Sequence, residues 1–101
     1  MATNKMRPIH PGEILREEFL GALAMSANAL AMHLHVPAPR INDIVRERRA
    51  VTADTALRLA RYFNTTAQFW LNLQSSFDLR QLEIEKGKLI AEQVRPMALA
   101  G

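Results

Sequence analysis

The sequence predicts an all-α protein of five helices in a single domain over residues 1–101, with a C-terminal helical extension at about residues 79–95. Apolar residues recur three and four positions apart through most of the chain, as they do along one face of a helix. No segment shows the apolar–polar alternation that is typical of a half-buried strand. Apolar residues make up 49% of the 101 residues, which is enough for one compact core.

The first two helices are predicted from their starting residues and their apolar spacing. Pro11 suits the first turn of a helix because the N–H group that proline lacks has no partner there. Ser26 can cap a second helix by accepting a hydrogen bond from an unpaired backbone N–H. The expected buried face of the first helix comprises Leu15, Phe19, Ala22 and Leu23. The expected buried face of the second comprises Ala27, Leu30, Ala31 and Leu34.

Three more helices follow. The segment 37–39 carries two prolines that can only begin a new helix, which we expect to end near Arg46. Thr52 can cap the fourth helix, and Asn64 suits the left-handed residue that ends it. A capping box at residues 65–68, threonine followed three positions later by glutamine, opens the fifth. The helical extension either continues this fifth helix or folds back on it. The buried residues expected in the third and fourth helices are Ile41, Ile44 and Val45, then Ala56, Leu59, Ala60 and Phe63. The fifth helix carries the apolar residues Phe69, Trp70, Leu73 and Phe77.

Missing features exclude several kinds of protein. The chain has no cysteine, so it can form neither a disulfide nor a thiolate metal site. No apolar stretch reaches the roughly 20 residues that a membrane-spanning helix needs. The first residues also lack the apolar core of a signal peptide. We therefore expect a cytoplasmic protein without a membrane partner.

The sequence does not predict an enzyme. The three histidines are His10, His33 and His35, and a two-residue spacing places His33 and His35 on different faces of a helix. Metal ligands on one helix prefer a spacing of three or four residues. No nucleophile, base and orienting group can be assembled, and no glycine-rich phosphate loop is present. We expect no cofactor, no metal and no catalytic residue.

Only three or four residues separate the second and third predicted helices, and this is the connection length of a DNA-binding helix-turn-helix, here at about residues 26–48. Ala31 is small where the two helices must approach closely, and Val36 fills the turn. His35 stands where glycine usually supplies a left-handed conformation, which histidine tolerates better than a branched residue. The alternatives are an ordinary helical hairpin with a solvated charged face, or a module that binds only protein.

The third predicted helix presents a face suited to reading DNA. If its apolar residues point inward, steps of about 100° place Pro39, Asp43 and Arg46 outward. Arg40 can donate twice to guanine, Asn42 can pair with adenine, and Asp43 can accept from cytosine. The arginines at the helix end suit phosphate contact, as do backbone donors at the start of the second helix. The predicted DNA-binding residues are Ser26, Asn28, Ala38, Pro39, Arg40, Asn42, Asp43, Arg46, Arg48 and Arg49.

The charge distribution suggests two faces with different partners. Residues 40–61 contain six arginines and three acidic residues, a net +3 that equals the formal charge of the whole chain. The first predicted helix carries Glu13, Glu17 and Glu18 against Arg16. The basic segment fits nucleic acid, and the acidic helix is compatible with a basic protein partner. Solvated surface charge is the alternative interpretation of both.

A homodimer is expected on geometric grounds. One helix reads only a few base pairs, so useful specificity needs two half-sites and a two-fold axis. The predicted dimer contacts are Trp70, Leu73 and Phe77, with Leu79 and Leu82 beyond them. The alternative for the aromatic residues is a place in the buried core.

Three segments resemble a known family. Residues 44–64 read IVRERRAVTADTALRLARYFN and resemble the phage-repressor-like (XRE) helix-turn-helix superfamily. Residues 69–74 read FWLNLQ and are similar to HigA/VapI-type antitoxins, as is the opening RPIHPGEIL at residues 7–15. The resemblance covers about residues 8–82. Glu47 and Asn64 stand where many relatives have glycine.

The resemblance implies a five-helix phage-repressor-like fold and a second role beside DNA binding. Such antitoxins bind and neutralise a HigB-type toxin, a ribosome-dependent messenger-RNA endonuclease, and repress their shared operon as dimers. We therefore expect double-stranded operator DNA, a second copy of the chain and a HigB-type toxin as partners. The alternative is an orphan transcriptional regulator of the same fold with no toxin partner, which only the neighbouring gene distinguishes.

Overall fold

The computed structural model describes residues 7–98, and within that range it contains helices and no strand. The first helix runs without interruption through α1 (Pro11–Ile14), the π-helical turn η1 (Leu15–Leu20) and α2 (Gly21–Leu23). It is followed by α3 (Ala27–Leu34), α4 (Ala38–Val45), α5 (Ala53–Phe63) and α6 (Ala67–Gln93). The predicted all-α class with five helices is confirmed.

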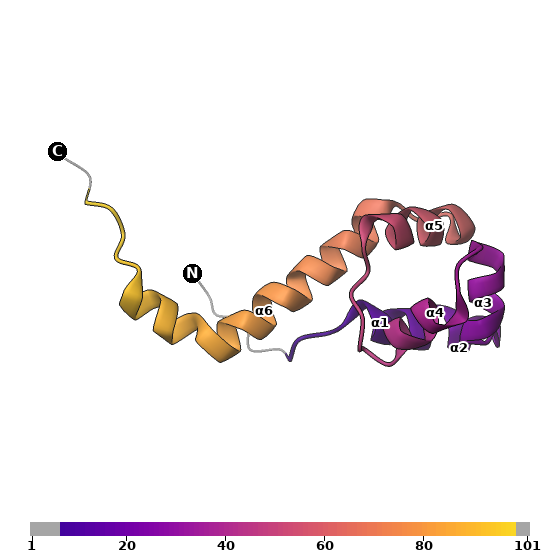
Figure 1. Ribbon diagram of the computed structural model, residues 1–101, viewed down its shortest axis with the longest axis horizontal. Helices are drawn as coiled ribbons and strands as arrows, with labels where there is room; N and C mark the ends of the chain where they lie inside the picture. Colours follow the sequence, from indigo (N-terminus) through magenta and orange to yellow (C-terminus); the bar gives the residue numbers. More distant parts are fainter. Residues whose placement is uncertain (1–6, 99–101) are drawn as a thin grey trace.

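The helices α1 to α5 form a compact group, and α6 leaves it. The first turns of α6 lie against α5 and α1, and its second half projects away from the group (Figure 1). The 27 residues of α6 span about 40 Å, so the chain measures 58 Å along its longest axis but only 24 and 23 Å across. The predicted extension therefore continues the fifth helix instead of folding back, and it ends at Gln93.

The π-helical turn shifts the buried face of the first helix. The N–H of Gly21 bonds to the carbonyl five residues earlier, which brings residues five apart onto one side. Leu15 and Leu20 are thereby both buried, whereas Leu23 is 55% exposed. The predicted inward face is therefore wrong for Ala22 and Leu23, because the regular period of 3.6 residues is lost at this turn.

Hydroxyl side chains cap α3, α5 and α6. Ser26 Oγ accepts a hydrogen bond from the N–H of Ala29 at 3.0 Å, as its predicted role requires. The helix α6 begins one residue later than predicted, because Thr66 accepts the hydrogen bond from the N–H of Phe69 at 3.0 Å. Thr65 instead accepts from Trp70 Nε1 at 2.8 Å. The capping box was therefore misplaced by one residue, and its first threonine anchors the indole.

Left-handed residues end the helices of the compact group. Ala24, His35, Glu47 and Asn64 all have φ between 51° and 62°. The prediction for His35 and Asn64 is confirmed. A left-handed conformation costs a non-glycine residue about 1–2 kcal/mol, so the surrounding packing must hold these turns.

Trp70 lies at the centre of the core, with its side chain 0% exposed. Its ring centroid is 5.0 Å from that of Phe19, and Leu15, Leu30 and Ile41 are also fully buried. Burial of each such aliphatic side chain stabilises the fold by about 1.5–3 kcal/mol. Trp70 has no exposed surface to offer a second chain, so its predicted place at a dimer contact is corrected to the core.

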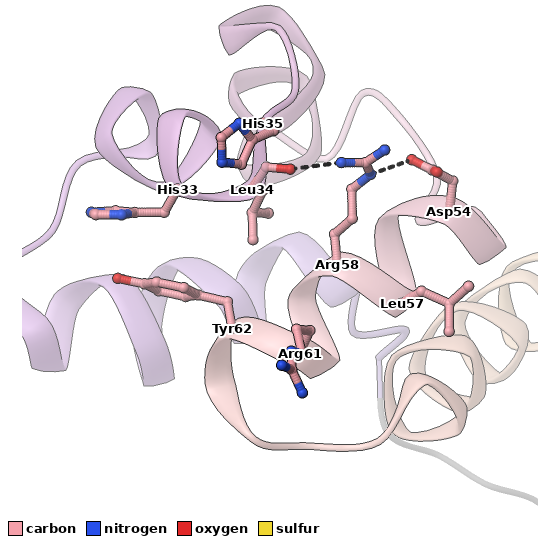
Figure 2. A pocket seen from close by; sticks show the side chains of 8 residues that line it. All are labelled: His33, Leu34, His35, Asp54, Leu57, Arg58, Arg61 and Tyr62. Atoms are coloured by element: carbon pink, nitrogen blue, oxygen red, sulfur yellow. Dashed lines mark hydrogen bonds and ion pairs between the residues drawn. The ribbon is translucent and has the colours of Figure 1, made fainter.

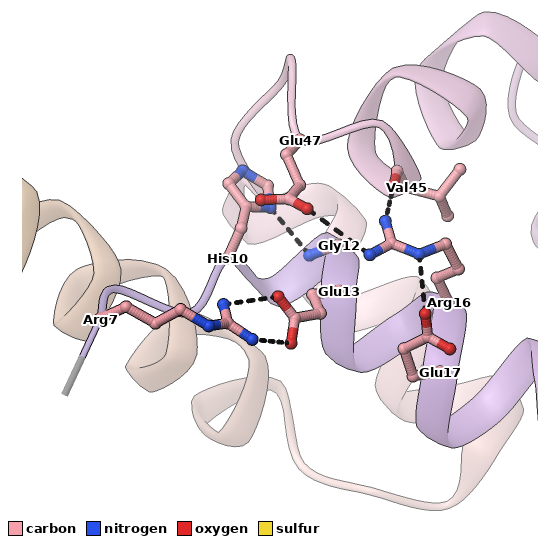
Figure 3. Close-up of polar contacts among 8 residues, drawn as sticks. All are labelled: Arg7, His10, Gly12, Glu13, Arg16, Glu17, Val45 and Glu47. Carbon is pink, nitrogen blue, oxygen red and sulfur yellow. Dashed lines mark hydrogen bonds and ion pairs between the residues drawn. The ribbon is translucent and has the colours of Figure 1, made fainter.

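The N-terminal end of α1 packs closely against the C-terminal end of α4. A Cβ atom on Gly12 would lie 1.8 Å from the backbone oxygen of Ile44, so only glycine allows this approach. His10 is 3% exposed, and its Nδ1 accepts a hydrogen bond from the N–H of Gly12 at 2.8 Å (Figure 3). The His10 ring meets the ring of Phe77 edge-on, with centroids 4.8 Å apart. His10 thus joins the first helix to α6 beside the contact with α4.

Burial lowers the pKa of His10 below its ordinary value, and protonation of Nδ1 would remove the acceptor for Gly12. We expect the free energy of unfolding to be fully retained above about pH 6.5, the ordinary pKa of histidine, and to fall as the pH drops through the lower pKa of the folded state. The loss should be roughly 1 kcal/mol, the value of one helix cap. Urea unfolding across this range of pH measures it.

The His10→Asn variant is expected to flatten this part of the profile, since an amide oxygen caps a helix at any pH. His33→Asn, the same change at an exposed position, is the matched control and should keep the wild-type profile. An unchanged acid-side loss in His10→Asn would show that another group causes it.

Candidate nucleic-acid interface

The helices α3 and α4 are joined by a tight turn at residues 35–37. The left-handed His35 reverses the chain, and the N–H of Val36 bonds to the carbonyl of Ala31 at 3.1 Å. Ala31 is 1% exposed, which lets the two helices approach closely. Ile41 and Ile44 are both 0% exposed and fix which face of α4 points inward. The steric pattern predicted for a helix-turn-helix is present.

The opposite face of α4 forms a shallow depression together with the start of α3. Most of the predicted DNA-binding side chains gather here, and they come from two helices. The residues that line the depression are Asn28, Ala38, Pro39, Asn42, Asp43 and Arg46. The inward packing of α4 therefore places amide, carboxylate and guanidinium groups on one exposed surface, which is the mixture of donors and acceptors that base edges require.

Two of the amides form a bridge between the helices. Asn42 Nδ2 donates to Asn28 Oδ1 at 2.7 Å and to the carbonyl of Ala38 at 3.0 Å. The amide of Asn42 is thereby held against the start of α4 and connected to the first turn of α3. An adenine paired to Asn42 would have to replace the hydrogen bond that Asn42 donates to Asn28.

Two charged side chains in the same region also have partners. Arg40 forms an ion pair with Asp54, with Nη1 and Oδ2 2.5 Å apart. Asp43 forms one with Arg49 at 3.3 Å. Their side chains are 30–54% exposed, so each pair contributes little to stability.

Arg46 and Arg48 lie at the C-terminal end of α4, and both are exposed. Neither forms an ion pair within residues 7–98. Glu47 between them has φ of 62°, so the chain turns sharply there. Ser26 uses its hydroxyl to cap α3, and its predicted phosphate contact would come from the backbone donors of that helix end.

Arg16 binds the C-terminal end of α4, the helix that lines the depression, and was not among the predicted site residues. Its Nη1 donates to the carbonyl of Val45, the last residue of α4, and its Nη2 lies 3.6 Å from a carboxylate oxygen of Glu47 (Figure 3). Arg16 and Val45 are 29 positions apart in the chain. No local sequence pattern predicts a contact between residues so far apart, so sequence analysis could not find it.

The acidic face predicted on the first helix is largely neutralised. The Glu13 carboxylate accepts a hydrogen bond from each terminal nitrogen of Arg7, both at 2.8 Å, and these bonds lower the pKa of Glu13. Glu17 lies 3.2 Å from Arg16 Nε. Only Glu18 in this set is exposed without an ion pair among the described residues.

Two other kinds of structure, a metal site and a membrane-spanning helix, are absent from the described part of the chain. Residues 7–98 contain no group of three or more histidine or acidic side chains placed to hold a metal ion. None of the helices in this range combines the length and the apolar character needed to cross a membrane.

Two short helices joined by a tight turn, with a polar face of the second exposed, define a helix-turn-helix DNA-binding protein. Residues 15–70 match the family model described as helix-turn-helix. The virulence-associated protein I of Dichelobacter nodosus is 60% identical over 83 residues, which are 82% of this chain and 77% of that protein.

Two solved structures are similar over nearly the whole chain. The Pseudomonas aeruginosa antitoxin HigA, solved with the higBA promoter, has a TM-score of 0.89 and 54% identity, covering 91% of this chain and 100% of that one. The antitoxin GraA in complex with its operator has a TM-score of 0.90 and 52% identity, covering 98% and 100%. This chain belongs to the helix-turn-helix family and, within it, to the HigA/VapI-type antitoxins, which are DNA-binding regulators and not enzymes.

Proposed function

We propose that the chain is a sequence-specific transcriptional repressor whose α4 enters the major groove of an operator. The observation that carries this proposal is the depression shared by α3 and α4, where six of the predicted DNA-binding residues meet. A helix with its side chains is about 10–12 Å in diameter, and the major groove is about 12 Å wide, so α4 can enter it.

Within this proposal the side chains divide into two kinds of contact. Asn42 and Asp43 line the depression, Arg40 lies beside it where α4 faces α5, and all three read base edges. Arg46 and Arg48 lie where α4 ends and contact phosphates, which set position and affinity but carry no sequence information. The relatives solved with their promoter or operator support DNA binding by this chain.

A homodimer would supply the second half-site, and the second half of α6 is its proposed contact. Leu73 and Phe77 are only partly exposed and pack against the core or His10, so they have little surface left. Farther along, four exposed apolar residues fall within an arc of about 100° and form a stripe that Lys86 interrupts between Leu82 and Leu89. They are Leu79, Leu82, Leu89 and Ile90, with exposures of 43–63%. A second copy of the same helix would cover this stripe.

The second proposed role is that of an antitoxin that binds and neutralises a HigB-type toxin and represses its own operon. Membership of the HigA/VapI-type group supports it. The acidic first helix gives it little further support, because Glu13 and Glu17 already form ion pairs within the chain. An orphan regulator that binds DNA alone is the second candidate.

Two substitutions separate base reading from phosphate contact. Arg40→Ala should cost about 1–3 kcal/mol on the preferred duplex and relax the base preference. Arg48→Ala should weaken binding to all duplexes alike and reduce the salt slope by about one unit. Binding is measured across salt concentrations on a duplex selected from a randomised pool and on random duplexes. Arg95→Ala, which removes the same charge beyond α6, is the control. Unchanged affinity in Arg40→Ala would mean that α4 does not read the DNA.

The dimer proposal is tested on α6 with a matched pair of variants. Leu82→Lys places a charge within the apolar stripe, so we expect light scattering at about ten micromolar protein to show a shift from dimer towards monomer. Ile84 is also exposed but lies about 200° around the helix from Leu82, so Ile84→Lys should leave the dimer intact. A wild-type monomer under these conditions, or equal effects of both variants, contradicts a dimer through this stripe.

The antitoxin role predicts a toxic partner encoded beside this chain. Expression of the adjacent small reading frame alone should arrest growth, and co-expression with this chain should restore it, with both proteins purified as one complex. A binding mechanism requires that complex. If no such frame exists, or if growth recovers without a physical complex, the antitoxin role is excluded and the orphan regulator stands.

A further inference from the structure

Asp54, in the first turn of α5, joins three helices through two arginines. Its Oδ2 lies 2.5 Å from Nη1 of Arg40 on α4 and 3.0 Å from Nε of Arg58 on α5. Arg58 in turn donates from Nη1 to the carbonyl of Leu34, the last residue of α3, at 2.9 Å (Figure 2). One carboxylate therefore connects both helices of the helix-turn-helix to α5.

These contacts set the positions of the Asp54 and Arg40 side chains and contribute little to the stability of the fold. The side chain of Asp54 is 54% exposed, and exposed ion pairs contribute little to stability. The hydrogen bonds from Arg58 and Arg40 hold the pKa of Asp54 below its usual range, so the carboxylate stays charged. Arg58 is fixed at both ends, by Leu34 and by Asp54, and so it limits where the carboxylate can lie.

The effect on Arg40 follows from the chemistry of its guanidinium. A flexible arginine with no partner beside DNA is attracted to the nearest phosphate, which carries no sequence information. When Nη1 is held by a carboxylate, the charge is partly balanced and the remaining N–H donors point in a fixed direction. A donor pair whose orientation is already set loses less freedom when it binds the two acceptors of guanine.

We propose that Asp54 is a positioning residue that directs Arg40 to a base instead of a phosphate, and that Arg58 fixes Asp54 in this role. The proposal rests on the proposed function of α4 as the helix that reads DNA. It assigns sequence specificity to a residue outside the helix-turn-helix, on a helix that carries none of the predicted DNA-binding residues.

The Asp54→Asn variant is expected to lose base discrimination without losing affinity for DNA in general. Loss of the negative charge should leave binding to random duplexes unchanged or stronger, with a steeper salt dependence, because Arg40 turns to phosphate. Discrimination at the base pair read by Arg40 should fall by about tenfold, part of the value of one bidentate arginine–guanine contact. A purely structural defect would instead weaken binding to every duplex.

Glu92→Gln is the matched control, since it removes one exposed negative charge near the end of α6, far from α4. Both variants change the net charge equally, so only the position differs. Asp54→Asn is also tested in the Arg40→Ala background, where it should cause no further loss of discrimination, because a positioning residue acts through the residue that it positions. The duplexes are selected from a randomised pool with the wild-type chain.

The outcomes separate this inference from the proposed function. If the wild-type chain selects no preferred sequence from the pool, the proposed function fails and the role of Asp54 fails with it. If the wild-type chain is specific but Asp54→Asn keeps its discrimination, only the role of Asp54 is overturned. It is also overturned if Asp54→Asn loses discrimination equally in the presence and absence of Arg40.

Discussion

The structure depends on how the C-terminal end of α4 is held. Ile41 and Ile44 bury one side of this helix, and the carbonyl of Ile44 lies so close to Gly12 that no side chain fits between them. Arg16 donates to the carbonyl of Val45 and closes the same end. With one face packed and one end bonded, α4 cannot rotate, and its remaining face must point to solvent. The exposure of Asn42, Asp43 and Arg46 in the depression follows from that constraint.

Around this fixed helix, the polar side chains are held by weaker interactions. Arg40, Asn42 and Asp43 each have a partner within the chain, and all of these contacts lie at least partly in solvent. Core packing is worth several kcal/mol per large residue, whereas an exposed ion pair is worth 1 kcal/mol or less, by order of magnitude. The frame is therefore rigid, and Asn42 and Asp43 can exchange their partners for DNA at small cost.

The helix α6 lies in two different environments. Its first turns carry Trp70 and Gln74 into the core, where Gln74 Oε1 accepts from the N–H of Val51 at 2.8 Å. Its later part projects away from the other helices, and Leu79 and Leu82 are exposed (Figure 1). A helix that is anchored at one end and apolar along an exposed stripe at the other is suited to join a second chain without disturbing the position of α4.

The sequence by itself determined the all-α class, the helix-turn-helix and several helix ends, because these depend on neighbours in the chain. Ser26 caps α3, and Asn64 and His35 take left-handed conformations, all from local chemistry. The tertiary structure alone decided the π-helical turn in the first helix and the core position of Trp70. It also decided the contacts of Arg16, because residues far apart in sequence compete for one core, and a local pattern carries no information about which of them meet.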